Sequence, residues 1–216
     1  MQEHIFLTGM ILKQTPVGEY DKHITLLTRE RGKITAFARG ARRPVSKLAA
    51  ATNPFVFGRF KVYQGKTSYT ISDVEVVNYF EELRMDYIGA CYGMYFAEVC
   101  DYYTRENNEE SEVLKLLYQS LRALGLESIP NPLVRAVFEC KVLTVNGEFP
   151  GVPTDMELHP STRYTLEYIM ASSVEKLYTF TVTEEVLQQL QRISERYMKY
   201  IVGKEFKSLE VLKSLQ

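Results

Sequence analysis

The sequence lacks the features that mark membrane and secreted proteins. Its longest apolar stretch, Ile88–Val99, is interrupted by Glu98 and is too short to span a bilayer. The first residues, Met1 to His4, show no basic region followed by an apolar run, so no secretory signal is expected. The chain has only 3 cysteines, an odd number, in mostly apolar surroundings. We therefore expect buried thiols in a reducing cytoplasm.

The common motifs of catalytic and metal sites are missing as well. There is no glycine-rich phosphate loop, no GxSxG and no HExxH. No CxxC pair occurs, and His4, His23 and His159 are scattered, so four converging zinc ligands are not expected. The paired acids Glu81–Glu82 and Glu109–Glu110 are adjacent residues, which point apart on a helix. The sequence predicts a protein that is not an enzyme and that holds no metal and no other cofactor.

What the sequence does have is charge that is segregated along the chain. The 26 Lys+Arg and 27 Asp+Glu nearly cancel overall. Residues 1–78 nevertheless carry a net charge of +6, and residues 79–216 carry −7. Between Arg29 and Lys66, ten basic residues occur with a single acid, Glu30. This segregation predicts that the basic half binds a polyanion and that the acidic half binds something else.

The basic half has the pattern of short β-strands. It is rich in β-branched and aromatic residues, and turn signals such as Pro16–Gly18 recur at short spacing. Five short strands in about 75 residues fit a small closed barrel of the OB type, and a five-stranded sandwich is the alternative. The expected strands are Ile5–Lys13, Lys22–Thr28, Lys33–Arg39, Phe55–Tyr63 and Thr67–Val77.

Two of these strands place basic and aromatic residues on the same side, because side chains alternate along a strand. Cations bind phosphates and rings stack on unpaired bases, so this combination suits single-stranded nucleic acid. The alternative is that the rings of the second strand face the other domain and that the bases are only solvated. The first set is Lys33, Phe37 and Arg39; the second is Arg59 and Lys61 with Phe55 and Phe57.

The segment that follows the third expected strand gives the sharpest signal. Gly40 permits a tight exit from the strand, and Pro44 restricts the chain after an arginine pair. Its bases have no acid nearby in the sequence, whereas ordinary solvated faces mix the two signs. Arginine side chains match phosphate oxygens in a bidentate manner. We predict a DNA-binding surface in which Arg39, Arg42, Arg43 and Lys47 contact phosphates and Lys33, Arg59, Lys61 and Phe37 extend the contact.

The acidic half has the apolar period of helices from Asp86 onward. Residues 88–102 are apolar almost all round, which predicts the central buried helix of a bundle. A Pro/Gly-rich connection follows at 148–159. Capping signals predict further helices at 108–125, 131–146, 183–203 and 208–215. The predicted fold class is α+β, with a five-stranded OB barrel over residues 1–78 and a helical bundle over residues 79–216.

Taken in order, these pieces resemble the RecO family of bacterial recombinational repair proteins. The resemblance implies an N-terminal OB domain and a C-terminal helical domain. It also implies binding of single- and double-stranded DNA, annealing of complementary strands, and help in loading the RecA recombinase onto DNA coated by single-strand-binding protein (SSB). RecR is the usual partner. The matching pieces include Gly18–Asp21, Thr28–Gly32, Ala38–Arg43, Tyr79–Arg84, Phe138–Leu143, Gly147, Pro150 and Lys207–Ser208.

The resemblance has one departure and one further implication. Many members carry a cysteine-rich zinc module after a Gly-x-x-Pro segment, whereas residues 151–159 of this chain contain no cysteine. No zinc module is therefore expected near residues 150–160. The resemblance also suggests that the acidic half receives the acidic, aromatic-ended tail of SSB. Arg122, Arg135 and Lys141 are the candidate cations, and the alternative is that they are ordinary surface residues that pair with local glutamates.

Two main hypotheses on function follow. The first is a non-catalytic mediator that binds and anneals DNA in the bacterial cytoplasm, associated with the nucleoid and not with a membrane. The second is an adaptor whose helical half docks partner proteins and whose OB half binds RNA or no nucleic acid. A third and weaker hypothesis is an enzyme with an unrecognised site. Salt-dependent DNA binding separates the first two, and any turnover favours the third.

Overall fold

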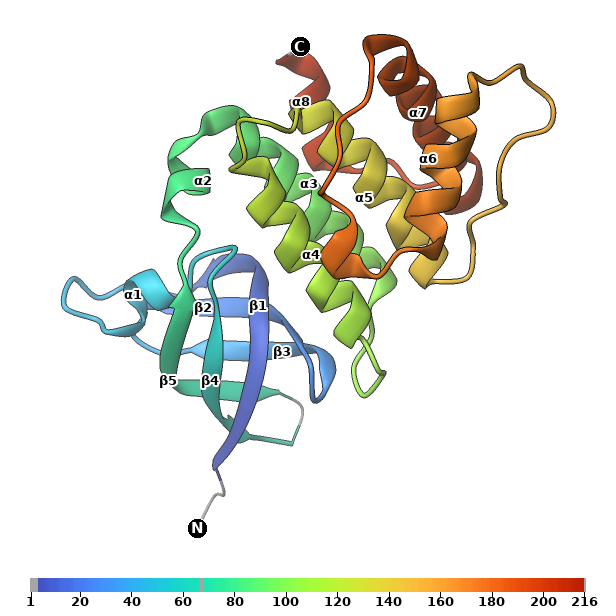
Figure 1. The fold of residues 1–216 in the computed structure, drawn as a ribbon. Helices are drawn as coiled ribbons and strands as arrows, with labels where there is room; N and C mark the ends of the chain where they lie inside the picture. Colours follow the sequence, from blue (N-terminus) through green and yellow to red (C-terminus); the bar gives the residue numbers. More distant parts are fainter. Residues whose placement is uncertain (1–3, 67, 216) are drawn as a thin grey trace. The chain divides into compact units, whose positions relative to one another are not determined.

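The computed structural model describes residues 4–66 and 68–215. The five strands between residues 4 and 78 form a closed barrel (Figure 1). The strand order around the barrel is β1-β2-β3-β5-β4. The β3–β5 pair is parallel and the other pairs are antiparallel. This is the barrel that the sequence predicts, and the sandwich alternative is wrong. The strands are β1 (His4–Val17), β2 (Asp21–Thr28), β3 (Gly32–Ala38), β4 (Phe57–Gln64) and β5 (Tyr69–Asn78).

The predicted strands are present with shifted ends. β1 continues through Pro16 to Val17, because Val17 still pairs with Asp21 across the hairpin. The turn therefore contains only residues 18–20. Phe55 is buried and has a left-handed φ of 71°, so it lies outside β4. The predicted start of the fifth strand, Thr67, lies outside the described residues.

The barrel core consists of the inward-facing side chains of all five strands. Ile34, Ala36 and Ala38 point inward from β3, as alternation predicts, and they are 1% exposed or less. Leu7, Ile24, Leu26, Phe60, Val62 and Ile71 complete much of this core. The short helix α1 (Leu48–Ala51) is tied to the barrel by Lys22, whose ammonium donates to the Ala49 carbonyl at 3.0 Å.

The β2–β3 turn is bound to residues 97–114, which form one compact unit with the barrel. The Lys33 N–H donates to the Arg105 carbonyl at 2.9 Å, and the Asn107 N–H donates to the Arg31 carbonyl at 2.8 Å. Gly32 has a φ of 61°, and a Cβ atom there would overlap the Arg105 carbonyl oxygen. Only glycine fits this position, because the backbone is left-handed and closely approached.

Residues 82–96 and 115–215 form the second compact unit, which is helical. The predicted helices over 108–125, 131–146, 183–203 and 208–215 are present with small shifts. α6 was not predicted. Gly203, with a φ of 60°, ends the helix predicted over residues 183–203. The helices of the chain are α2 (Glu81–Met85), α3 (Tyr87–Tyr103), α4 (Ser111–Leu124), α5 (Asn131–Val145), α6 (Pro160–Ala171), the 3₁₀ turn η1 (Val174–Lys176), α7 (Glu184–Tyr197), the π-helical turn η2 (Met198–Val202) and α8 (Lys207–Ser214).

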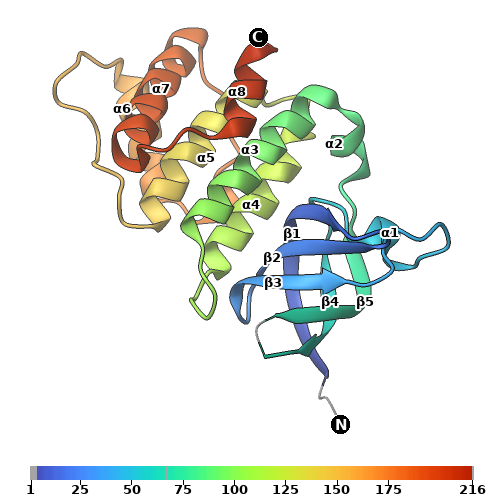
Figure 2. The ribbon, with the colours of Figure 1, turned by 180° about the vertical axis from the view of Figure 1, so that it is seen from behind.

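The central helix of this unit is α5 and not the helix predicted over residues 88–102. Figure 2 shows α5 between α3 and the α6–α7 pair. Every residue from 133 to 143 of α5 is buried, whereas Ile88 and Met94 of α3 are exposed. The burial of α5 is not evident from the sequence, because this helix contains charged residues whose partners lie inside the unit. None of the helices among the described residues is long and apolar enough to cross a membrane.

Candidate nucleic-acid interface

Residues 39–47, which we call the basic segment, leave the end of β3 and lead to α1 (Figure 1). The segment is fastened to the β1–β2 turn by backbone and side-chain contacts. The Gly40 N–H donates to the Asp21 carboxylate at 2.7 Å, and the Arg42 N–H donates to the Tyr20 carbonyl at 2.9 Å. The Arg42 guanidinium donates to the Gly18 carbonyl at 3.1 Å. These contacts hold the segment in one place on the barrel surface.

The predicted phosphate ligands Arg39, Arg42, Arg43 and Lys47 are brought together on this segment, and all four are exposed. None of them forms an ion pair within the described residues. Cations that are not held in ion pairs are available to an external anion. The segment can therefore bind consecutive phosphates without first breaking an internal pair.

Tyr20 is a member of this surface that the sequence-based analysis missed. The Arg43 guanidinium lies over its ring at 5.1 Å from the centroid, a cation–π contact that orients the arginine. A hydrogen bond with the Glu19 side chain raises the pKa of Tyr20. The one indication of this residue in the sequence is that it lies within Gly18–Asp21, one of the segments that carry the family resemblance.

The outward side chains of β2 and β3, with the end of β1, form what we call the β2–β3 face. Phe37 lies directly opposite His23, and their ring centroids are 5.3 Å apart at an angle of 77°. Both rings are partly exposed. In the sequence, His23 is one of three scattered histidines, and nothing there predicts its pairing with Phe37. The face comprises Lys13, Thr15, His23, Thr25, Thr35 and Phe37. Its one acid within the described residues is Asp21 at the start of β2, whose carboxylate accepts a hydrogen bond from the Gly40 N–H at 2.7 Å.

The predicted bases Arg59 and Lys61 lie on a different part of the barrel, which we call the β4–β5 face. β4 pairs with β1 and β5 and has no pairing with β2 or β3. Arg59 lies 4.3 Å from the centroid of the Phe6 ring and 3.9 Å from the Glu75 carboxylate, and Lys61 is in register with Asp73. Acids from the neighbouring strand therefore offset these bases. The face comprises Phe6, Arg59, Lys61, Asp73 and Glu75.

Lys33, the remaining predicted base on β3, is used inside its own unit. Its ammonium lies 2.7 Å from the Asp101 carboxylate and also donates to the Asp101 carbonyl. The Lys33 side chain is 22% exposed. Lys33 therefore helps to hold residues 97–114 against the barrel, and its ammonium is not part of the open surface.

The three cations predicted to receive a partner tail do not lie together. Arg122 is exposed on α4, whereas Lys141 is 6% exposed. The Lys141 ammonium donates to the carbonyls of Ile169 at 3.0 Å and Ser172 at 2.6 Å, at the C-terminal end of α6. A lysine in this position satisfies carbonyls that the helix leaves unpaired. The structure therefore does not support Lys141 as a cation that a partner can reach.

Arg135 belongs to a buried network inside the helical unit. It is 2.8 Å from Glu139 and 3.0 Å from Glu195. Glu139 also accepts hydrogen bonds from Tyr95 at 2.8 Å and from Ser194 at 2.6 Å. Burial, and then the charge of Glu139, raise the pKa of Tyr95 well above its usual value. Arg135 thus pairs with local glutamates, as the alternative to the tail site states, but it is buried and is not the surface residue that this alternative describes.

A groove of about 680 Å³ lies above this network, with Arg135 among its lining residues. Its apolar part contains Met198, Phe206 and Leu209, and its polar part contains bases and acids. The bases are Arg192, Arg196, Lys199, Lys204 and Lys213, and the acids include Glu205 and Glu210. Sequence reasoning missed these bases because they belong to residues 192–213, which are far from Arg135 in the chain.

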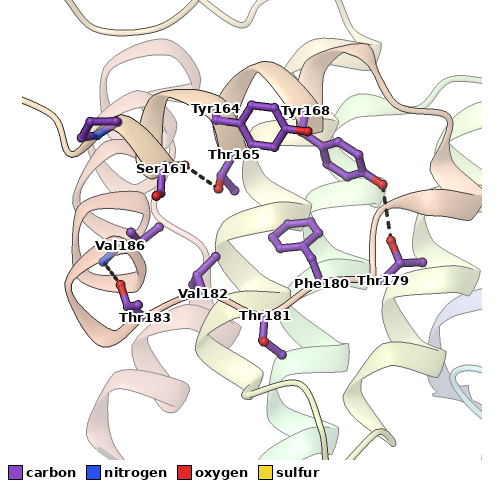
Figure 3. A pocket seen from close by; sticks show the side chains of 11 residues that line it. Ser161, Tyr164, Thr165, Tyr168, Thr179, Phe180, Thr181, Val182, Thr183 and Val186 are labelled. Carbon is purple, nitrogen blue, oxygen red and sulfur yellow. Dashed lines mark hydrogen bonds between the residues drawn. The ribbon is translucent and has the colours of Figure 1, made fainter.

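A second hollow in the helical unit lies between α6 and residues 179–183 (Figure 3). It measures about 720 Å³, and hydroxyl groups dominate its lining. The Tyr168 hydroxyl lies 3.3 Å from the Thr179 hydroxyl, and the Phe180 ring meets Tyr168 edge-on. No carboxylate, amine, imidazole or thiol lines it. It therefore offers no cation for the phosphates of a nucleic acid.

The described residues contain no group of three or more His, Cys, Asp or Glu side chains that could hold a metal ion. Cys100 and Cys140 are fully buried, and burial raises the pKa of both thiols. A buried thiol with a raised pKa is a poor metal ligand, because metals bind the thiolate.

Comparison with known proteins gives full-length matches. The family model described as "Recombination protein O N terminal" matches residues 1–80, and "Recombination protein O C terminal" matches residues 84–152 and 148–210. The DNA repair protein RecO of Acetivibrio thermocellus is 29% identical, over 96% of this chain and 96% of the relative. RecO of Clostridium novyi is 26% identical over 98% and 95%, and RecO of Symbiobacterium thermophilum is 38% identical over 67% and 57%.

Proposed function

The chain belongs to the RecO family of DNA repair proteins, which are recombination mediators and not enzymes, and from this premise we propose how it handles DNA. It binds single- and double-stranded DNA through the basic segment and anneals complementary strands. The observation that carries this proposal is a set of four exposed cations on one fastened loop, none of which forms an ion pair within the described residues: Arg39, Arg42, Arg43 and Lys47. Phosphate contacts of this kind supply most of the affinity in sequence-independent binding.

Annealing follows from the same chemistry. Two complementary strands repel each other through their phosphates, so a protein that brings them together must neutralise both. A basic loop without a base-reading helix neutralises phosphates and leaves the base edges free to pair. The reaction needs no nucleotide hydrolysis, because the base pairing itself releases free energy. Annealing by this protein is therefore expected without ATP.

The groove above Arg135 is the proposed docking site for the acidic, aromatic-ended tail of SSB. An aromatic ring suits the apolar part around Phe206, and the exposed bases Lys199 and Lys204 suit the acids of the tail. Lys204 lies 5.4 Å from the centroid of the Phe206 ring, so a cation and an apolar surface meet at one point. Together with RecR, this docking would bring the protein to SSB-coated DNA and promote RecA loading.

The DNA part of the proposal is tested by annealing of two complementary oligonucleotides with the full chain and without ATP. We expect annealing far above the spontaneous rate and a steep loss of DNA binding as salt rises. Binding of single and double strands is measured in the same buffers. A chain that binds no DNA at moderate salt, or that needs ATP to anneal, contradicts the proposal.

The docking part is tested by fluorescence anisotropy of a labelled acidic peptide that ends in phenylalanine. We expect saturable binding to the full chain and a clear loss on Lys199→Glu. Arg163→Glu, an equal charge change on exposed α6, is the matched control and should bind the peptide normally. Equal losses in both variants would show that the peptide responds only to net charge, and no binding at all would remove the groove from the proposal.

A further inference from the structure

Resting on the proposed DNA binding, we propose that His23 and Phe37 form a stacking platform for the unpaired bases of single-stranded DNA. The two rings lie side by side on neighbouring strands of the β2–β3 face. The platform gives the protein a contact that it makes with single strands and not with duplexes. Single-strand preference thus resides on this face, while the basic segment binds the phosphates of both forms.

The backbone fixes both rings at the same level of the barrel. His23 and Phe37 are directly opposite each other in the antiparallel β2–β3 pair, and each points outward between inward core residues. The ring centroids are 5.3 Å apart and the planes meet at 77°. An edge-to-face pair of this kind holds one ring upright against the other. Neither ring therefore has to be ordered when a base arrives.

The neighbours of the two rings leave them accessible to bases. Thr15 lies opposite His23 in β1, and Thr70 lies beside Phe37 in β5. These side chains are small and uncharged, so they neither cover the rings nor repel a nucleic acid. The face is flanked by cations: Lys13 on β1, and Arg39 two residues beyond Phe37. Rings with cations nearby combine the two kinds of contact that a single strand offers, its unstacked bases and its phosphates.

The ring on the β4–β5 face is in a different situation. The Arg59 guanidinium lies 4.3 Å from the centroid of the Phe6 ring, and Lys61 lies 6.0 Å from it. The stacking surface of Phe6 is thus already used by the protein's own cations, which in turn face Glu75. The Phe6 side chain is exposed, but its ring already contacts two of the protein's own cations, and it supplies an internal control.

Duplex DNA cannot use the platform, because its bases are already stacked and paired. Stacking on a ring is also largely independent of counterion release, unlike phosphate contacts. Single-strand binding should therefore persist to higher salt than duplex binding. Replacement of the Phe37 ring should remove this difference without changing duplex affinity.

The natural sequence contains no tryptophan, so a single introduced indole reports on its own site. The test measures the fluorescence of Phe37→Trp and Phe6→Trp during titration with oligothymidine, with a duplex of equal length, and with oligouridine. We expect saturable quenching of Phe37→Trp by oligothymidine, little quenching by the duplex, and little quenching of Phe6→Trp by any of the three. Equal quenching of both variants, or none in Phe37→Trp while DNA is bound, overturns the platform. Stronger binding of oligouridine overturns the assignment to DNA.

Affinity measurements on ring variants complete the test. Phe37→Leu keeps an apolar side chain but has no ring, and it should bind oligothymidine about five- to tenfold more weakly, the low end of the usual effect of one stacked base. Phe37→Tyr keeps the ring and should bind like the natural chain. Duplex affinity should be unchanged in both. If the natural chain binds neither form of DNA, the proposed function fails; if it binds both and Phe37→Leu changes neither, only the platform fails.

Discussion

The β2–β3 face and the β4–β5 face have nearly the same pattern along their own strands, yet they present different surfaces. β3 carries Lys33 and Phe37, and β4 carries Arg59 and Lys61 between aromatic residues. The neighbouring strand makes the difference. β5 places Asp73 and Glu75 beside the bases of β4, whereas β2 places His23 and Thr25 beside β3.

The comparison indicates that the bases of a strand are open to a polyanion only if no neighbour supplies an acid, as Asp73 and Glu75 do for β4 and Asp101 does for Lys33. Residues opposite each other in a sheet interact directly, and an acid there attracts the cation and repels phosphate. Because only one acid occurs between Arg29 and Lys66, the sequence shows this whole region as uniformly basic. The acids of β5 lie beyond that region and become neighbours of β4 only when the barrel closes.

The largest effect is expected from charge reversal on the two surfaces. Arg42→Glu with Arg43→Glu removes two phosphate contacts and adds repulsion, and it should weaken single-strand binding by about 100- to 1,000-fold at moderate salt. Arg59→Glu with Lys61→Glu makes the same change in net charge beside Asp73 and Glu75. We expect it to weaken binding by less than about tenfold. Both are measured by electrophoretic mobility shift, with circular dichroism as the control for folding.

Equal losses of DNA affinity in the two double variants would contradict the difference between the two faces, because net charge alone would then explain binding. A larger loss on the β4–β5 face would transfer the phosphate track to that face. A lost circular dichroism spectrum in Arg42→Glu/Arg43→Glu would call for glutamine replacements at the same positions, which remove the charge without adding repulsion.

The next effect concerns the turn that joins β2 and β3. Gly32→Ala should lower the free energy of unfolding by about 2–3 kcal/mol, because the left-handed backbone is strained and the new Cβ meets the Arg105 carbonyl. Gly18→Ala is the matched control. Gly18 has a φ of 56° but no atom within 4 Å of the new Cβ, so a loss of about 1 kcal/mol is expected. Urea unfolding measures both, and equal losses would show that the contact with Arg105 contributes nothing.

A smaller effect separates Lys33 from the basic segment. Lys33→Gln should cost about 1 kcal/mol of stability, since the ion pair with Asp101 is partly exposed, and should leave DNA affinity within about twofold. Lys47→Gln should do the reverse, with a several-fold loss of affinity and unchanged stability. A loss of DNA affinity in Lys33→Gln would return this residue to the binding surface.

The smallest expected effect is that of metal removal. We expect no stoichiometric zinc in the purified protein, and no shift of its melting temperature with a chelator, because residues 151–159 contain no cysteine and the thiols Cys100 and Cys140 are buried. Elemental analysis checks this. One zinc per chain would contradict it.

The barrel and most helices could be predicted from the sequence because they depend on local periodicity and turn residues. Inward positions such as Ile34 and Ala36 follow from alternation alone. The contacts of individual charges could not be predicted. Lys33 forms an ion pair with Asp101, which lies 68 residues further along the chain. The pairing of His23 with Phe37 likewise depends on strand register, which periodicity does not fix.

The helical unit shows the same limit more strongly. The sequence predicts the central buried helix at residues 88–102, whereas in the structure α5, which carries Arg135, Glu139 and Lys141, is the central one. Each charge has its partners inside the unit: Arg135 and Glu139 pair with each other, and Lys141 binds carbonyls of α6. Buried ions are stable only with such partners. The sequence shows the charges but not the residues that compensate them.

The salt dependence of DNA binding tests the account's central claim most directly. The logarithm of the single-strand affinity is plotted against the logarithm of salt concentration for the natural chain, Arg42→Gln/Arg43→Gln and Arg59→Gln/Lys61→Gln. Each phosphate contact contributes about 0.7 to the slope for single strands. We predict that the first variant lowers the slope by about 1.4, for two lost contacts, and that the second leaves it unchanged. A slope that falls for Arg59→Gln/Lys61→Gln and stays constant for Arg42→Gln/Arg43→Gln would contradict the account.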